Sequence, residues 1–567
     1  MTVVSTRDRL AWLRAMWRAG MFAPAPPRAL AASARAMRAY GPIGAATTVG
    51  AARFGDRTAV VDDRGPVSYR DLDRASKALA TAWARQGIGP GSRVALLCRN
   101  HRGLLQAMSA AAKLGAGIIL LNTDFAGPQL RGALKDEDVS ALVHDEEFAP
   151  LLEGTDLPQG VYTAWSDDGT CDLDDLGAGQ ALTPPPPPHA SRLVILSSGT
   201  TGRPKGAARS SAPSEPLALP GGILSRIPLR RGEPVLVAPP LFHGWGLTSA
   251  TLALGLGCTL VLHRRFDAAR AVAALAEHRC TTMIAVPTML GRMLRVPDLA
   301  SRDLSALRVV ATGGGPLTPR LTREVTDAFG PVLHNFYGST EASCISIATP
   351  EDLAAAPGCA GYPPPGTTVT ILDDEGRPVP PETVGRIHVS SPTRFDGYTS
   401  GGAAPSGPLL PIGDLGHLDR DGRLHVDGRA DDMIVSGGEN VHPAEIEELL
   451  AAHDGVAEAA VVGVPDEEFG QRLRAFVVAA PGEGEPDAEE LRRYVAANLA
   501  RYKVPREVVF LDALPRTATG KVIKRELTRV PVPGSTPGSA PGPALEPKPV
   551  SGTAPEPTRG PGPEQGG

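Results

Sequence analysis

The chain has 567 residues, too many for one simple hydrophobic core, so we expect two or more folded units. Hydrophobic residues make up 42% and charged residues 21%, which is ordinary for a soluble protein. The formal net charge of −5 gives no electrostatic basis for nucleic-acid binding, and no apolar run approaches the ~20 residues of a membrane span.

A basic amphipathic helix is predicted within the first 24 residues. One side of this helix would carry the apolar residues Leu10, Leu13, Met16 and Trp17. Its other faces would carry Arg9, Arg14 and Arg18. The arginines interrupt the apolar stretch, which argues against a signal peptide. The helix could lie on a membrane surface or dock on the protein body, and docking is favoured because most amphipathic helices face a core. Residues 1–45 are interpreted as an N-terminal extension.

Short β-branched runs alternate with helical patterns from Val60 to about Val426, which predicts α/β layering. The clearest strand candidates are residues 192–196, 234–238, 258–262, 281–286, 307–311 and 386–390. Helices are expected between them at 267–278 and 319–329, and a stiff polyproline linker, TPPPPPHA, precedes the strand at 192–196. Residues 46–428 are therefore assigned to a large domain of layered α/β sub-domains.

A smaller α+β domain is expected over residues 429–528. It contains a helix that begins at Pro443, strands at 459–464 and 475–480, and a helix near 488–499. Residues 529–567 consist mainly of Pro, Gly, Ser, Thr and Glu, so we expect this tail to be disordered.

The cysteines are scattered and form no CxxC pair: Cys98, Cys171, Cys258, Cys280, Cys344 and Cys359. Free cysteine is among the most buried residue types. This usage predicts reduced, mostly buried thiols in a cytoplasmic protein rather than a disulfide framework or a zinc site.

The stretch LSSGTTGRPKG, residues 196–206, has the composition of an anion-binding loop. Small residues let backbone N–H groups approach an anion, and the hydroxyls add donors. It does not fit GxxxxGK[ST], because Lys205 follows a proline and precedes a glycine. The lysine is therefore not placed to bind a terminal phosphate as in a kinase-like site.

Further motifs follow in a fixed order: PLFHGWG (240–246), ATGGGPL (311–317), NFYGSTEAS (335–343), GDLGHLDRDGRLHVDGR (413–429), SGGENVHPAEIE (436–447) and LPRTATGKVIKREL (514–527). The third would place Tyr337 and Glu341 on a loop after a strand. Together the motifs resemble the adenylate-forming (AMP-binding) superfamily, most closely its bacterial fatty-acyl-CoA synthetases. The resemblance covers roughly Val49 to Leu527, outside which lie the first ~45 residues and the tail.

The resemblance implies a large N-terminal domain, a small mobile C-terminal domain and a two-step reaction. A carboxylate attacks the α-phosphate of ATP to give acyl-AMP and pyrophosphate, and the thiol of coenzyme A then displaces AMP. Because the substrate is its own nucleophile, the protein must supply charge neutralisation and positioning. ATP, Mg²⁺ and coenzyme A are the implied cofactors and co-substrates.

The resemblance also implies roles for the residues of the large domain. The leaving phosphates would be held by Ser197, Ser198, Gly199, Thr200, Thr201, Gly202 and Lys205, and the α-phosphate by Thr340. The adenine ring would be surrounded by Gly313, Gly314, Gly315, Tyr337 and Gly338. The ribose would be held by Asp414 with Arg429. Glu341 would bind Mg²⁺ with help from Ser197. His243 is expected either to orient the acid or to gate its pocket. At this position, amino-acid-activating members of the family have an aspartate that binds the ammonium group of the substrate. Histidine in its place favours an acid without an α-amino group.

Three further sites are implied in the small domain. Lys521 would bridge carboxylate and phosphate in the first step, as a compact positive charge suits two anions. Asp431 would be the hinge about which the domain rotates, so that Lys521 leaves and Ser436, Gly437 and Gly438 enter to bind coenzyme A.

Two departures from the family pattern are expected to alter affinity rather than abolish the chemistry. Ile412 stands where Ser or Thr usually precedes the GD of the ribose motif, and AARSSAPSEP, after Gly206, lacks a common histidine.

The acid and its acceptor stay open at this point. The favoured hypothesis is a medium- or long-chain fatty-acid CoA ligase, for which the aliphatic run Leu247–Leu256 and the strand-flanking glycines Gly313 and Gly314 could make room. The alternatives are an acyl-AMP ligase that loads a carrier protein, an aryl-acid CoA ligase, and a catalytically silent scaffold whose Pro-rich tail recruits partners. The expected partners are small molecules, with peripheral contact at the inner face of the membrane and oligomer formation left open.

Overall fold

The computed structural model of the chain describes residues 4–179, 184–197, 205–210, 215–395, 397–399, 407–430, 433–480, 486–515 and 522–530. Of residues 197, 205, 207–210 and 398 only the backbone is described. The described residues up to Thr528 form one compact unit. The predicted disordered tail, from residue 531 onward, lies outside the described residues.

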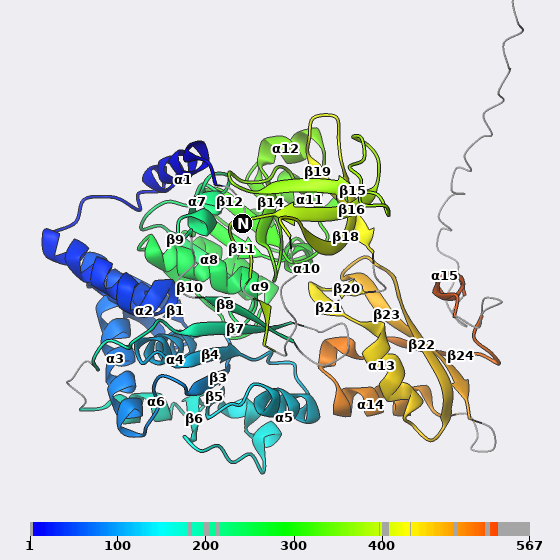
Figure 1. Ribbon diagram of the computed structural model, residues 1–567, viewed down its shortest axis with the longest axis horizontal. Coiled ribbons are helices and arrows are strands. Elements are labelled where there is room, and N and C mark those ends of the chain that lie inside the picture. The colour runs from blue at the N-terminus through cyan, green and yellow to red at the C-terminus, as the bar shows by residue number, and fades with distance from the viewer. Residues whose placement is uncertain are drawn as a thin grey trace, which may run out of the picture. The chain divides into compact units, whose positions relative to one another are not determined.

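Two mainly parallel sheets form the centre of the large layered part (Figure 1). The first has the order β14-β13-β12-β11-β9-β10-β1-β2, and the second β17-β8-β7-β4-β3-β5-β6. Antiparallel pairing is confined to their edges, at β1–β2, β13–β14, β7–β8 and β8–β17. Strands such as Val309–Gly313 are buried throughout, as expected where helices cover both faces of a parallel sheet.

The strand bounds of the first sheet are β1 Thr58–Asp62, β2 Gly65–Ser68, β9 Pro234–Val237, β10 Thr259–Val261, β11 Thr282–Ala285, β12 Val309–Gly313, β13 Leu333–Ser339 and β14 Ser343–Ala348. Those of the second are β3 Arg93–Leu97, β4 Gly117–Leu120, β5 Ala141–Asp145, β6 Val161–Trp165, β7 Arg192–Ser197, β8 Lys205–Ser210 and β17 Gly397–Tyr398. The five strands predicted in these two sheets, at 192–196, 234–238, 258–262, 281–286 and 307–311, agree with these bounds to within two residues at each end.

Helices pack on both sheets: α3 Tyr69–Arg85, α4 Arg102–Lys113, α5 Gly127–Asp136, α6 Asp172–Gly177, α7 Ala218–Leu224, α8 Gly244–Gly255, α9 Ala268–Glu277, α10 Pro287–Met293, α11 Pro319–Phe329 and α12 Pro350–Ala355. The helix predicted at 319–329 has a clear local cause. The Thr318 side chain accepts a hydrogen bond from the Leu321 N–H, and Pro319 occupies the first helical position, where its missing N–H costs nothing.

The remaining sheets are smaller. An antiparallel sheet contains β15 Thr368–Leu372, β16 Gly385–Ser390, β18 Leu410–Leu418 and β19 Leu424–Arg429. The last contains β20 Ile434–Ser436, β21 Glu439–Val441, β22 Val456–Asp466, β23 Gly470–Ala479 and β24 Glu507–Phe510, with helices α13 Pro443–Ala451, α14 Ala488–Asn498 and α15 Lys524–Leu527. The expected α/β class, with a large layered part and a smaller C-terminal α+β part, is confirmed.

Two helices form the N-terminal extension, α1 Thr6–Arg18 and α2 Pro27–Phe54. Figure 1 shows them in dark blue at one edge of the fold, next to α7 and α8. α2 is kinked at Gly41, whose φ of 66° lies outside the helical range and which precedes Pro42. The expected boundary at residue 45 falls inside this helix.

α1 docks through a different face from the predicted one. Trp12 is completely buried, packs against Gly221 and Gly366, and donates its indole N–H to the Pro365 carbonyl at 2.9 Å. Met16 is also buried, whereas Leu10, Leu13 and Trp17 are exposed. The prediction that the helix docks is therefore confirmed, but the grouping of Met16 with the three exposed residues is wrong.

The cysteines are all free and buried, as predicted. Among the described residues, no helix combines the length and apolar character needed to cross a membrane.

Candidate active site

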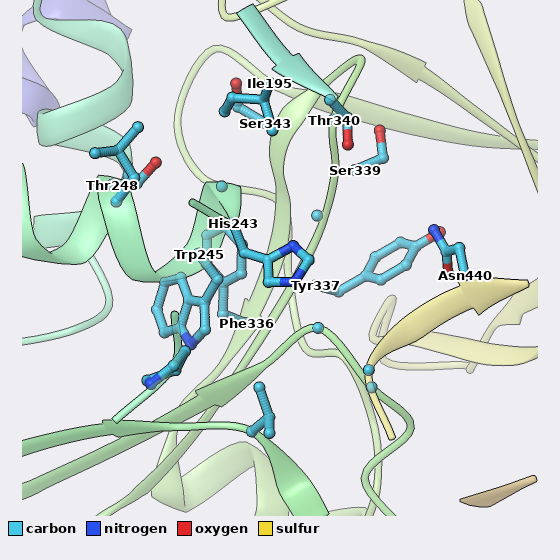
Figure 2. Close-up of a pocket in the computed structure, with 18 of the residues that line it drawn as sticks. Ile195, His243, Trp245, Thr248, Phe336, Tyr337, Ser339, Thr340, Ser343 and Asn440 are labelled. Carbon is cyan, nitrogen blue, oxygen red and sulfur yellow. The ribbon is translucent and has the colours of Figure 1, made fainter. Parts of the chain in front are cut away.

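A cavity of about 2000 Å³ lies at the carboxyl ends of the parallel strands (Figure 2). Lining residues follow β9, β11 and β12 in the first sheet and β4 in the second, and others come from the end of β13. This edge is where ligands bind in open α/β sheets, because the loops that leave the strands can diverge there. Further lining residues come from β20 and β21, so both the large part and the C-terminal part contribute to the cavity.

Tyr337, Asp414 and Arg429 form a hydrogen-bonded group at one end of the cavity. Asp414 and Arg429 are directly opposite each other on β18 and β19, and Arg429 Nη1 donates to Asp414 Oδ1 at 2.6 Å. The Tyr337 hydroxyl donates to the other oxygen, Asp414 Oδ2. Burial, together with the neighbouring Asp414 charge, raises the pKa of Tyr337 well above its ordinary value, so the phenol stays protonated as a donor.

The glycines near Tyr337 set how closely chain segments approach. Gly314, at φ 78°, and Gly315 line the cavity, whereas Gly313 lies behind them, where a Cβ would come 2.7 Å from the Phe336 carbonyl oxygen. A Cβ on Gly438 would lie 3.0 Å from the Gly314 carbonyl oxygen. The segment Ser436–Gly438 of the C-terminal part therefore lines the cavity next to Gly314.

The hairpin between β13 and β14 carries Ser339, Thr340 and Glu341, all of which line the cavity. Tyr337 itself lies within β13, not on the loop after it as the sequence suggested. Phe395 N–H donates to the Glu341 carbonyl at 2.8 Å and thereby fixes the hairpin. A carboxylate and two hydroxyl groups on one hairpin are hard oxygen donors of the kind that Mg²⁺ prefers, so these residue types fit the implied metal.

His243 projects into the cavity between the Trp245–Phe336 pair and Tyr337 (Figure 2). It directly precedes α8, and its Nε2 lies 2.7 Å from Glu439 Oε1 of β21. Burial lowers the pKa of His243, but the charge and hydrogen bond of Glu439, with the charge of Asp124, outweigh that effect and raise it. His243 therefore joins the large part to the C-terminal part in this arrangement.

The segment before His243 is held by Asn100, a residue that sequence reasoning missed. Its side-chain amide donates to the Pro239 carbonyl at 2.9 Å, and its carbonyl oxygen accepts from the Leu241 N–H at 2.8 Å. Asn100 is buried and lies far from this segment in sequence, so no local pattern pointed to it.

Beyond His243 the cavity becomes apolar and follows α8. Trp245 stacks on Phe336 with ring centroids 4.3 Å apart, and Thr248, Thr251 and Gly255 line the cavity on successive turns of the helix. A Cβ on Gly255 would meet nothing within 4 Å, so there is open space at the far end of α8. Other lining residues, none of which the sequence assigned to the site, are Met16 and Met21 and, from α2, Met37, Ile43, Ala46 and Val49.

Several predicted site residues lie outside the described part of the chain: Lys521, Asp431, Ser198, Gly199, Thr200, Thr201 and Gly202. Ser197 and Lys205 are described by their backbone, which pairs across the end of β7 and β8. Their side-chain roles, like those of the other site residues, stay predictions.

The chain matches two protein-family models. The AMP-binding enzyme model matches residues 48–399, and the AMP-binding enzyme C-terminal domain model matches residues 445–521. It is 36% identical to an indoleacetate–CoA ligase from Aromatoleum aromaticum, over 84% of this chain and 95% of that protein. It is 34% identical to the fatty acid–[acyl-carrier-protein] ligase ScoC from Streptomyces coeruleorubidus, over 83% and 92%.

Solved structures resemble the chain over a similar length. The amide bond synthetase McbA from Marinactinospora thermotolerans superimposes with a TM-score of 0.75 and 32% identity, over 86% of this chain and 99% of that one. The relatives named here thus differ in the acid they take and in the group that receives it, so they leave this chain's own substrate open.

Proposed function

This chain belongs to the AMP-binding enzyme family, and we propose that it activates a medium- or long-chain fatty acid with ATP and transfers the acyl group to coenzyme A. In the first step a carboxylate oxygen bonds to the α-phosphorus of ATP, and the bond to the β-phosphate oxygen breaks to release pyrophosphate. In the second step the sulfur of coenzyme A bonds to the acyl carbon and AMP leaves.

The polar end of the cavity supplies groups for the nucleotide. Asp414 would accept hydrogen bonds from the ribose hydroxyls, since a carboxylate is an acceptor only, and Arg429 and Tyr337 hold it in place. Gly314 and Gly315 leave room for the adenine ring beside Tyr337. Glu341, with Thr340 and Ser339, would hold Mg²⁺, which supplies positive charge to the phosphates when bound.

The C-terminal part stands in the arrangement that suits the second step. Ser436–Gly438 lie against Gly314, and Gly438 has no side chain to obstruct the approach of a thiol-bearing arm. The contact between His243 and Glu439 stabilises this arrangement. Lys521 would act in the other arrangement, in which it neutralises the carboxylate and the α-phosphate as they approach.

The observation that carries the choice of acid is the apolar continuation of the cavity along α8. From Gly244 to Gly255 the helix advances about 16 Å, at about 1.5 Å per residue, and lining residues occur along this whole length. An extended alkyl chain advances roughly 1.25 Å per carbon, since C–C bonds of about 1.5 Å zigzag, so this length accommodates about 13 carbons. A compact aryl acid would leave most of this space unfilled.

The experiment is a panel of carboxylic acids assayed by pyrophosphate release, with and without coenzyme A. The panel contains acetate, octanoate, tetradecanoate, indoleacetate and ferulate. We expect kcat/KM to rise with alkyl chain length, and the acyl group to appear on coenzyme A. Preference for either aromatic acid over tetradecanoate would refute the fatty-acid assignment. Transfer of the acyl group to a supplied carrier protein but not to coenzyme A would refute the assignment of coenzyme A as the acceptor.

A further inference from the structure

The N-terminal extension carries most of the exposed large apolar side chains among the described residues. They are Leu10 (48% exposed), Leu13 (38%), Trp17 (70%), Phe22 (42%), Leu30 (51%) and Met37 (43%), and we call these six residues the apolar patch. Only Val384 and Val426 are comparable elsewhere in the described chain. All six lie within 28 residues of the chain, on α1, on α2 and on the segment between them. Exposed apolar side chains gathered in this way are typical of a contact surface.

On α1 the patch lies on the side away from the docking face. Leu10, Leu13 and Trp17 follow the i, i+3, i+7 spacing of one helix face, while Trp12, Ala15 and Met16 are buried against the protein. α1 is therefore apolar on two sides, and docking accounts for only one of them.

The charge around the patch is strongly positive. Residues 4–40 contain seven arginines against one aspartate, a formal charge of +6 in a chain whose overall charge is −5. All seven arginines are exposed: Arg7, Arg9, Arg14, Arg18, Arg28, Arg35 and Arg38. Only Arg9 has a salt bridge, to Glu215, among the ion pairs of the described residues. Apolar side chains, among them a tryptophan, flanked by arginines are suited to an anionic lipid surface, where the rings and alkyl groups enter the interface and the arginines meet headgroups.

The patch is continuous with the apolar end of the cavity. Phe22 and Met37 belong to both, since each lines the cavity and is more than two-fifths exposed. Met16 and Met21 connect them to the interior wall. The cavity thus reaches the surface beside the apolar patch and its arginines.

We propose that the apolar patch and its arginines bind an anionic membrane surface, so that a membrane-dissolved acid enters the cavity between α1 and α2. The part about the acid rests on the proposed function, whereas the binding of the membrane surface does not. A long-chain acid partitions into lipid, and this route would let its alkyl chain pass from lipid to the apolar wall with little exposure to water. The exposed apolar face of α1 would contact the membrane, and the exposed Phe22 and Met37 would line the entrance to the cavity.

The direct test measures binding of the full chain to vesicles of phosphatidylcholine alone and to vesicles with about 30% phosphatidylglycerol, where each arginine adds attraction. Co-sedimentation is one readout and tryptophan emission the other. Of the five tryptophans, all within the described residues, Trp17 is exposed and the other four are buried, so a blue shift on binding would report this site. We expect a blue shift, and binding at least tenfold tighter to the anionic vesicles.

Two double variants test the two components of the surface. Leu13→Ser with Trp17→Ser should weaken vesicle binding at least tenfold, with Val384→Ser, at a valine whose exposure lies between those of Leu13 and Trp17, as the control. Arg14→Gln with Arg18→Gln should weaken it by about fivefold per arginine at low salt, with the exposed Arg85→Gln as the control. Neither pair lines the cavity or contributes to the docking face, so both variants should keep the wild-type circular dichroism spectrum.

Activity separates this proposal from the proposed function. With octanoate in solution the variants should match the wild type, and with tetradecanoate supplied in anionic vesicles the Leu13→Ser, Trp17→Ser variant should be several-fold slower. If the wild type turns over no fatty acid, the proposed function fails, and vesicle binding still decides the membrane contact. Wild-type protein that binds neither vesicle, or variants that bind like wild type, would overturn the proposal. So would a wild-type dimer that dissociates in the Leu13→Ser, Trp17→Ser variant, because a second copy would then be what covers the patch.

Discussion

If an acyl chain extends along α8, a bulky residue at either of two positions on the helix should limit the length of the acid that the enzyme accepts, and the two limits should differ. Thr251 and Gly255 both line the cavity, seven and eleven residues beyond Gly244. At about 1.5 Å per residue these positions lie about 10 Å and about 16 Å along the helix. At roughly 1.25 Å per carbon, Thr251→Trp should stop chains longer than about 8 carbons and Gly255→Phe chains longer than about 13.

The magnitude follows from the burial of methylene groups. Each buried methylene contributes about 0.8 kcal/mol, which is about fourfold in kcat/KM while the cavity is being filled. Tetradecanoate has six more methylenes than octanoate, so the Thr251→Trp variant should lose up to about 5 kcal/mol of its preference for the longer acid, roughly four-thousandfold in kcat/KM. This is an upper limit, because a free alkyl chain already buries part of its surface.

The assay is pyrophosphate release at saturating ATP and coenzyme A, with acids of 4 to 16 carbons. Thr251→Val, which nearly keeps the shape of threonine, is the matched control and should keep the wild-type length profile. Octanoate turnover should survive in both bulky variants. The proposed path along α8 would be refuted if the two variants stopped chains at the same length, or if Gly255→Phe stopped shorter chains than Thr251→Trp.

Three further predictions concern the polar end of the site. Lys521→Ala should abolish formation of acyl-AMP yet still convert pre-made acyl-AMP to thioester; equal loss in both half-reactions would contradict domain rotation. Asp414→Asn should raise the KM for ATP about tenfold or more through the loss of a charged acceptor, with a smaller effect on the KM for the acid; unchanged ATP kinetics would contradict the ribose assignment. Glu439 and Asp124 raise the pKa of His243, so protonated His243 should stabilise the present arrangement of the large and C-terminal parts through its contact with Glu439. This stabilisation should be complete below the ordinary histidine pKa of about 6.5 and should be lost as the pH rises through the raised pKa. Thioester formation from acyl-AMP should therefore slow with rising pH, and Glu439→Gln should flatten that profile, whereas an identical profile in the variant would exclude this pair as the cause.

Local patterns predicted the secondary structure well where its causes are local. Buried β-branched runs became strands, and the Thr318–Pro319 start of α11 needed only neighbouring residues. β22 and β23 extend well beyond the predicted strands, because they pair with each other along ten residue positions, and that pairing has no signature within either segment.

The N-terminal helix shows where a local pattern misleads. Its apolar periodicity is compatible with more than one face, and which face is buried depends on Gly221 and Gly366, more than 200 residues away, whose lack of side chains admits the Trp12 ring. The same docking places Met16 on the cavity wall and leaves Trp17 exposed.

The order and residue types of the motifs by themselves determined the family, the layered α/β architecture and the residue types that the polar end of the site would use. Only the tertiary structure decided that Glu439 meets His243 across 196 positions of sequence, and that α1 and α2 line the same cavity as α8. The physical reason is that hydrogen-bonding and turn preferences act over a few residues, whereas a cavity wall is made by packing between segments whose distance along the chain carries no information about their contact.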